Sequence, residues 1–275
     1  MNLAAKQFDL SNARACVQAS AVAYHTDTIS EPTTDTHCSV CDMSDCIIIA
    51  FRGSVSIRNW ITDADFKRAW LISKNGGPNC EVHAGFLAAF DAILTRLTGH
   101  LASCAVGTRP IFVTGHSLGG ALAVLAALEL TRQKFNVCQV YTFGQPRVGN
   151  RAFKALYESC VETHGQAARA TTFRVVYQED IVARVPHLPA WRDPYCHVGT
   201  EIFVSSVDAG DLWIDPPLLR LLISDAWGIW RAWCIRHYAG AIEPMRDHHI
   251  NNYVVAMSNA SEAALPSHPP YTPPS

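Results

Sequence analysis

The sequence predicts an α/β fold in which a mostly parallel central sheet carries helices on both faces. Strand-like runs recur along the 275-residue chain, and they are apolar without alternation. Continuous hydrophobicity suits strands that are covered on both sides of a sheet. Helical patterns lie between these runs, and alternating strands and helices favour parallel strands joined by right-handed crossovers. The predicted strands are residues 46–51, 110–114, 137–143, 172–177 and 201–204.

The predicted helices rest on apolar residues that recur at helical spacing. In one of them, for example, Phe86, Phe90 and Leu97 fall on one face. A chain of this length with 49% hydrophobic residues can bury one large core, so residues 1–264 are expected to form one domain. The tail 265–275 contains five prolines and is expected to lack regular structure. The predicted helices are residues 11–24, 86–101, 118–133, 151–163 and 248–257.

The charge of the chain argues against nucleic acid and anionic membranes as partners. Its 22 basic and 24 acidic residues leave a formal net charge of −2, so no polycationic surface is expected. The partner is expected to be uncharged or small.

No export leader or membrane span is expected. The first residues lack the charged-then-apolar order of a secretory signal, because Arg14 interrupts the apolar run that follows Lys6. The most apolar later stretch is interrupted by Arg220, Asp225 and Arg231, and each charge is costly inside a bilayer. A cytoplasmic protein is therefore the default expectation, although export without a visible signal would look the same.

The ten cysteines permit disulfides without demonstrating any. Most lie in apolar segments, where a free cysteine acts as a small buried hydrophobe. The exception is the group His37, Cys38, Cys41 and Cys46, whose C-x2-C spacing also occurs in zinc and iron–sulfur sites. This group lacks a second ligand pair at suitable spacing. A hairpin tip ahead of the strand 46–51 is the preferred interpretation, and no metal is predicted.

A serine in a glycine-rich turn is the most informative local feature. Ser117 lies in Gly115-His116-Ser117-Leu118-Gly119, between a predicted strand and a predicted helix. This strand–serine–helix turn, a nucleophile elbow, holds the serine at positive φ and needs small neighbours so that the helix can pack close to the strand. The Leu118 N–H is then expected to point to where negative charge develops on a substrate. The alternative is an inert serine in a glycine-rich turn.

Two further loops follow predicted strands at the carboxyl edge of the sheet, where catalytic groups of open α/β sheets gather. Ser54 follows the strand 46–51 and could supply a second oxyanion donor through its N–H and hydroxyl. Asp180 follows the strand 172–177 and could orient a general base, and Glu179 and Asp193 compete for this role.

His248 is the preferred general base because it opens the last predicted helix. Serine is a poor nucleophile at its own pKa, so an imidazole must take its proton during attack and pass it to the leaving alcohol. The chain order Ser117, Asp180, His248 is that of α/β hydrolases. Among the twelve histidines, the alternatives for the base are His249, His187 and His197.

Together these residues resemble the class 3 lipase family over roughly residues 47–253. Its motifs occur in order: residues 48–54, 82–86, 115–120 and 142–150, then Asp180 with Pro186, and His248 five residues before Tyr253. Gln145 stands where family members often carry serine or threonine. The doublet of His248 and His249 makes the base ambiguous by one residue, and the interval to Tyr253 favours His248.

The resemblance implies an α/β-hydrolase fold and hydrolysis of carboxylic esters, most of all acylglycerols, with a lipid or ester substrate that can lie at a lipid–water interface. It implies Ser117 as nucleophile, Asp180 as acid, His248 as base, Ser54 with Leu118 as oxyanion hole, and no metal or other cofactor. Two alternatives stay open: a soluble carboxylesterase for short or aromatic acyl esters, and a catalytically silent fold that binds lipid or protein. The oligomeric state is not predicted.

Two segments could contribute to a substrate pocket. Ile57, Trp60 and Ile61 lie at helical spacing on one face of the segment 57–64. In fungal relatives the similar segment is a lid over the serine, and a fixed helix fits the pattern equally well. His83 could line the pocket or simply start a helix. A Trp-rich segment, residues 211–238, could lie at an interface, but burial against the core is preferred.

Overall fold

The computed structural model describes residues 1–3, 5, 7–54, 67–71, 80–104, 106–162, 170–178, 180–186, 193–204, 212–214 and 247–261. Within this part of the chain, one eight-stranded sheet has the strand order β1-β2-β3-β6-β7-β8-β9-β10. Its strands are β1 (Ile29–Glu31), β2 (Thr36–Asp42), β3 (Ile47–Phe51), β6 (Ile111–His116), β7 (Val137–Phe143), β8 (Thr171–Tyr177), β9 (Thr200–Val204) and β10 (Leu212–Ile214). A separate antiparallel pair consists of β4 (Arg68–Leu71) and β5 (Cys80–His83).

The five central strands, β3, β6, β7, β8 and β9, are parallel to one another. The strands at the two edges, β1 and β2 on one side and β10 on the other, pair antiparallel. The predicted mostly parallel sheet is thus confirmed. All five predicted strands are present as central strands, with ends that differ by at most two residues.

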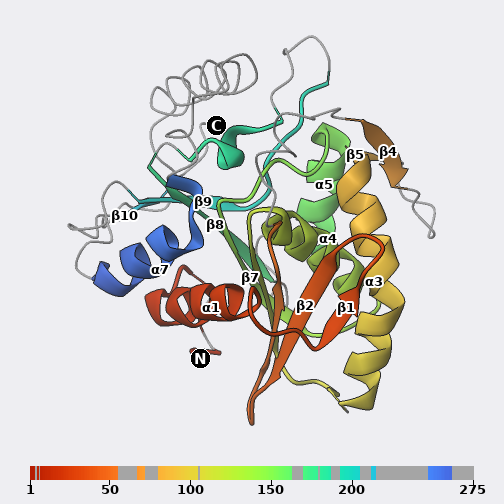
Figure 1. Ribbon diagram of the computed structural model, residues 1–275, viewed down its shortest axis with the longest axis horizontal. Coiled ribbons are helices and arrows are strands. Elements are labelled where there is room, and N and C mark those ends of the chain that lie inside the picture. The colour runs from red at the N-terminus through yellow and green to blue at the C-terminus, as the bar shows by residue number, and fades with distance from the viewer. Residues whose placement is uncertain are drawn as a thin grey trace, which may run out of the picture.

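Helices cover both faces of the sheet (Figure 1). On one side lie α3 (Ala84–Ser103), α4 (Leu118–Arg132) and α5 (Arg151–Cys160), and on the other lie α1 (Leu10–Val22) and α7 (Ile250–Asn259). Successive residues of a strand point to opposite faces, so Ile47 and Ile49 enter the core under α3 and α4, whereas Ile48 enters the core under α1 and α7. Two buried layers therefore hold the sheet between the helices.

The cysteine-rich segment differs from its predicted structure. Cys38 and Cys41 lie within β2, which pairs antiparallel with β3, rather than at a hairpin tip. Because these residues are three apart in a strand, they face opposite sides: Cys38 joins the core under α3 and α4, and Cys41 packs with Cys46 on the α1 side. The three thiols therefore cannot converge on one ion. The nine cysteines among the described residues are free thiols.

Other expectations fall partly outside the described residues. The last predicted helix, α7, begins at Ile250 rather than at His248, because His249 has extended backbone and caps the helix. The tail 265–275 and most of the Trp-rich segment lie outside the described part of the chain. Where the chain is described, no helix is long and apolar enough to cross a lipid bilayer.

The contact between α4 and β3 gives a test of the fold. A Cβ added at Gly119 would lie 2.1 Å from the backbone oxygen of Phe51, whereas one added at Gly99, exposed on α3, would meet nothing within 4 Å. We expect Gly119→Ala to lower the free energy of unfolding by about 3 kcal/mol or more, because backbone must shift. Gly99→Ala should instead raise it by about 0.5–1 kcal/mol. Denaturant unfolding of both variants measures these free energies. An unchanged free energy of unfolding in Gly119→Ala would contradict the close packing of α4 on β3.

Candidate active site

Ser117 occupies a strained turn between β6 and α4. Its φ of 59° and ψ of −129° lie in a region that residues with a side chain rarely adopt. Its backbone N–H donates to the Phe143 carbonyl at 2.9 Å, and its carbonyl accepts from the Gly120 N–H at 2.9 Å. Leu118 is the first residue of α4, where N–H groups have no carbonyl partner within the helix. The turn thus lifts the serine off the sheet beside the N-terminus of a helix.

Asp180 and His248 form a buried hydrogen-bonded pair. Asp180 follows β8, His248 precedes α7, and Nδ1 of the imidazole lies 2.7 Å from Oδ2 and 2.9 Å from Oδ1 of the carboxylate. Because a carboxylate accepts, Nδ1 carries the proton, and Nε2 is left as the basic nitrogen. Within the described residues, this buried Nε2 makes no hydrogen bond. It is therefore the ring atom that can take up a proton.

The Asp180 carboxylate is held ionised by several donors. Besides His248, the Tyr253 hydroxyl donates to Oδ2 at 2.5 Å, and the Val182 N–H donates to Oδ1 at 2.8 Å. Burial alone would raise the pKa of Asp180, but the facing His248 and the hydrogen bonds from His248 and Tyr253 outweigh it and hold this pKa below its usual range. The carboxylate can therefore fix the tautomer of His248 and stabilise its protonated form.

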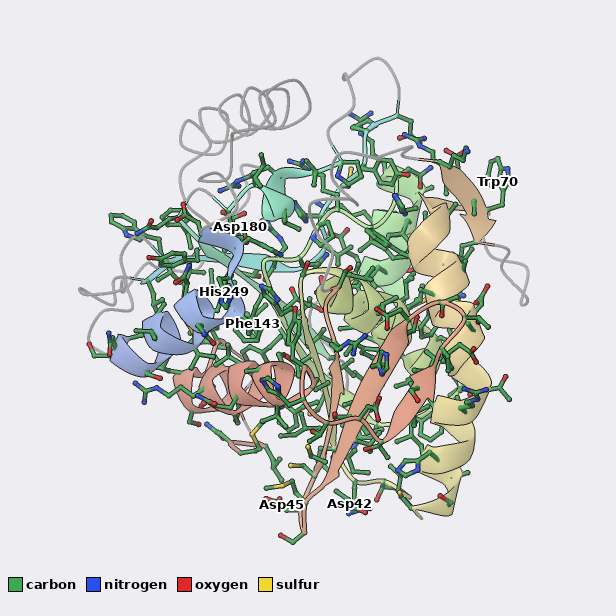
Figure 2. All side chains as sticks on the ribbon, in the orientation of Figure 1. Asp42, Asp45, Trp70, Phe143, Asp180 and His249 are labelled. Atoms are coloured by element: carbon green, nitrogen blue, oxygen red, sulfur yellow. The ribbon has the colours of Figure 1, made fainter. Side chains whose placement is uncertain are left out.

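Gly144, directly after β7, brings the serine turn next to this pair. Its φ of +58° favours glycine, and an added Cβ would lie 2.6 Å from Oδ2 of Asp180 and 2.9 Å from Nδ1 of His248. The preceding residue, Phe143, accepts the hydrogen bond from Ser117. Phe143, Asp180 and His249 accordingly lie at one end of the sheet, near the start of α7 (Figure 2).

The loop that carries Ser54 runs alongside the serine turn. A Cβ added at Gly53, one residue earlier, would lie 2.7 Å from the His116 carbonyl oxygen and 3.1 Å from Cβ of Ser117. The start of this loop is braced by Arg52, whose guanidinium lies 2.7 Å from the Asp35 carboxylate. The carboxyl ends of β3, β6, β7 and β8 thus meet around one serine, one imidazole and one carboxylate.

The competing candidates that the structure describes have other partners. His249 is exposed and caps α7. His197 bonds the Ala183 carbonyl at 2.8 Å, and Asp193 accepts from Asn150 at 2.8 Å. Glu179 and His187 lie outside the described residues.

Of the four pocket candidates, the structure describes only His83. His83 is buried at the N-cap of α3, where its Nδ1 accepts from the Gly85 N–H at 3.2 Å and its ring stacks on Phe86. Ile57, Trp60 and Ile61 lie outside the described residues. A role for these four residues in binding substrate stays a prediction.

Sequence reasoning missed the supporting residues Tyr24 and His116. His116 stands inside the elbow motif, so its place next to the serine was visible, but its contacts were not. Tyr24 carried no local signal, because α1 meets β6 across about ninety residues of chain, as in the hydrogen bond between Ser20 and Thr114. Tyr253 was singled out only by its interval from His248.

The bond from Tyr253 to Asp180 predicts a pH-dependent stability. Because the pKa of Asp180 is lowered in the folded protein, the pair stabilises the fold above the ordinary aspartate pKa of about 4, and this contribution is lost as the pH falls through the lowered pKa. Tyr253→Phe removes one donor and moves the pKa back upward. We expect Tyr253→Phe to lower the free energy of unfolding by about 1.5–3 kcal/mol at neutral pH, and by a smaller amount at about pH 3.

Tyr157→Phe is the matched control for this change. The Tyr157 hydroxyl is also buried, but it bonds the neutral Thr172 hydroxyl at 2.8 Å. Its loss should cost about 1 kcal/mol at both pH values. Denaturant unfolding at both pH values measures the loss of unfolding free energy in each variant. An equal loss for Tyr253→Phe at both pH values would contradict an ionised Asp180 as the acceptor.

Comparison with known proteins agrees with this geometry. Residues 48–190 match the family model described as "Lipase (class 3)". A secreted mono- and diacylglycerol lipase of Fusarium solani is 33% identical over 184 residues, which cover 65% of this chain and 49% of the relative. A solved lipase from Rhizopus microsporus var. chinensis superimposes with a TM-score of 0.58 at 27% identity, over 71% of this chain and 74% of that chain.

A second solved structure, of a triacylglycerol lipase whose catalytic centre is described as a serine protease triad, has a TM-score of 0.56 at 28% identity over 74% of this chain and 82% of that chain. The chain spans about half the length of the curated relatives it matches. The fold is that of the α/β hydrolases. The family match covers more than half of the chain, and the chain belongs to the class 3 lipase family.

Proposed function

We propose that the chain is a serine hydrolase that cleaves carboxylic esters, most of all acylglycerols, through an acyl-enzyme. The observation that carries this proposal is the buried bond of 2.7 Å between Asp180 and His248, next to a serine held at a φ of 59°. A protein that only binds ligands has no need for an ionised acid, an oriented imidazole and a strained serine in one place.

The proposed reaction has two halves. In the first, the Ser117 hydroxyl attacks the ester carbonyl while Nε2 of His248 takes its proton, and the same nitrogen then delivers the proton to the leaving alcohol. In the second, water attacks the carbonyl of the acyl-enzyme while Nε2 of His248 takes its proton, and the same nitrogen returns the proton to the Ser117 oxygen as the acyl–serine bond breaks and the carboxylic acid leaves. Both tetrahedral intermediates carry an oxyanion, which the Leu118 N–H at the start of α4 and the Ser54 N–H or hydroxyl would stabilise.

The choice of acylglycerols is supported by the relatives rather than by a pocket. The Fusarium solani protein is named as a mono- and diacylglycerol lipase, and the second solved neighbour is described as a triacylglycerol lipase. An uncharged ester substrate also suits a chain with a net charge of −2, which offers no polycationic surface for nucleic acid. No cofactor is invoked, because serine, histidine and aspartate complete the reaction.

The relatives also bear on the compartment. We propose export for this chain in place of the cytoplasmic expectation, because the Fusarium solani relative is named as a secreted lipase. For residues 57–64, a mobile lid and a fixed helix both stay predictions, because this segment lies outside the described residues.

A series of esters tests the proposed activity and its acyl preference. We expect hydrolysis of p-nitrophenyl esters to increase from acetate toward palmitate, and activity on emulsified triacylglycerol above its solubility limit, because a lipase binds long acyl chains at an interface. Ser117→Ala is the blank. Activity confined to soluble short esters would make the protein a carboxylesterase, and no Ser117-dependent turnover together with no labelling by a fluorophosphonate would rule out the serine hydrolase.

The adjacent histidines offer a matched pair of variants for the base. His248 is 2% exposed and bonded to Asp180, whereas His249 is exposed and caps α7. We expect His248→Ala to lower kcat by about 10⁴–10⁶-fold. His249→Ala should leave kcat within about threefold and cost only about 0.5–2 kcal/mol of stability through the lost cap. Comparable losses of kcat in the two variants would contradict the assignment.

A further inference from the structure

The Tyr24 hydroxyl lies between the serine turn and the loop that carries Ser54 (residues 52–54, here the oxyanion loop), although the proposed reaction does not use it. Tyr24 stands two residues beyond the end of α1. Its hydroxyl packs against the backbone of Gly53 and lies 2.8 Å from Nδ1 of His116. A Cβ added at Gly53 would lie 2.1 Å from this hydroxyl and 3.1 Å from Cβ of Ser117. The phenol therefore packs against Gly53, the residue before Ser54, and bonds to His116, the residue before the nucleophile.

His116, the residue before the nucleophile, continues this chain of hydrogen bonds to the base. Its Nε2 lies 2.8 Å from the carbonyl oxygen of His248. A carbonyl only accepts, so Nε2 of His116 carries the proton, and in the neutral ring Nδ1 must accept from Tyr24. Burial and the neighbouring His248 hold the pKa of His116 well below its usual range, in agreement with a neutral ring.

The two imidazoles also stack on each other. The ring centroids of His116 and His248 are 4.6 Å apart, with an interplanar angle of 27°. His248 is thus held at three places: its Nδ1 edge by Asp180, its backbone carbonyl by His116, and one ring face by His116. This support matters because His248 lies two residues before the first residue of α7, outside that helix.

A neutral His116 is required by the chemistry of its neighbour. His248 becomes an imidazolium in the proposed reaction, and a second positive charge stacked on it would oppose that step. By donating to Nδ1, the Tyr24 hydroxyl occupies the only ring position of His116 that could take up another proton. The same hydroxyl packs against Gly53, so one phenol connects the oxyanion loop, through His116, to the base.

We propose that Tyr24 and His116 are positioning residues for the ester hydrolysis proposed above. They hold the oxyanion loop and His248 in position relative to Ser117. They also keep the His116 ring, which stacks on His248, neutral. Neither residue touches the substrate. This inference rests on the proposed function for its kinetic consequence, while the hydrogen bonds and the tautomer can be tested without turnover.

Kinetics of Tyr24→Phe test the positioning role. We expect kcat for a soluble p-nitrophenyl ester to fall about tenfold with KM changed by less than about twofold, because misplaced groups slow the chemical step rather than binding. Tyr157→Phe is the control, because it removes a buried, hydrogen-bonded phenol hydroxyl on the α5 side of the sheet. It should leave kcat within about twofold of the unmodified protein. Equal kcat values for Tyr24→Phe and the unmodified protein would overturn the kinetic role.

Nuclear magnetic resonance of protein with ¹⁵N-labelled histidine tests the geometry independently. We expect the unmodified protein to show His116 as the neutral Nε2–H tautomer. The signals of His116 are identified as those that disappear in His116→Gln. We also expect Tyr24→Phe, but not Tyr157→Phe, to shift the low-field Nδ1–H resonance of His248. A protonated or Nδ1–H His116, or an unshifted His248 resonance, would overturn the inference. Absence of ester hydrolysis by the unmodified protein would count against the proposed function alone, since these resonances remain measurable.

Discussion

The site depends on how closely the turn at Ser117 packs against its neighbours. At Gly115 an added Cβ would lie 2.2 Å from the Gly119 carbonyl oxygen, and at Gly119 it would lie 2.1 Å from the Phe51 oxygen. Only residues without side chains let α4 approach β3 and β6 so closely, and this approach is what forces the positive φ at Ser117. The buried apolar face of α4 stabilises the strained turn, because the helix lies in the core along most of its length.

Asp180, His116 and His248 are buried at this edge of the sheet, and hydrogen bonds tie each of them to another element. Asp180 receives donors from His248 and Tyr253 on the α7 side, and His116 connects to Tyr24 beyond α1. Burying a carboxylate is costly unless charge and hydrogen bonds compensate it. The hydrogen bonds therefore serve two ends at once: they satisfy buried groups, and they set which nitrogen of each imidazole carries a proton.

Much of the site was predictable from the chain because the signals are local. A serine flanked by glycines between an apolar strand and an apolar helix specifies a turn by itself, and polar residues directly after parallel strands must meet at one sheet edge. Hence Ser117, Ser54 and Asp180 could be located from sequence, and the distance of 2.7 Å between Asp180 and His248 agrees with the chosen pair. The strand β2 was not predicted, since its sequence also fits a metal-binding loop.

The sequence by itself determined the parallel α/β core, the turn at Ser117 and the order of the candidate residues, because these follow from hydrophobic periodicity and from the backbone needs of glycine. Only the tertiary structure showed that His248 is buried and bonded to Asp180 whereas its neighbour His249 is exposed, because two adjacent residues of one type look alike in the sequence. It alone also brought Tyr24 to His116, across 92 residues of chain. Such contacts depend on how helices and strands pack, and local sequence patterns do not predict that packing.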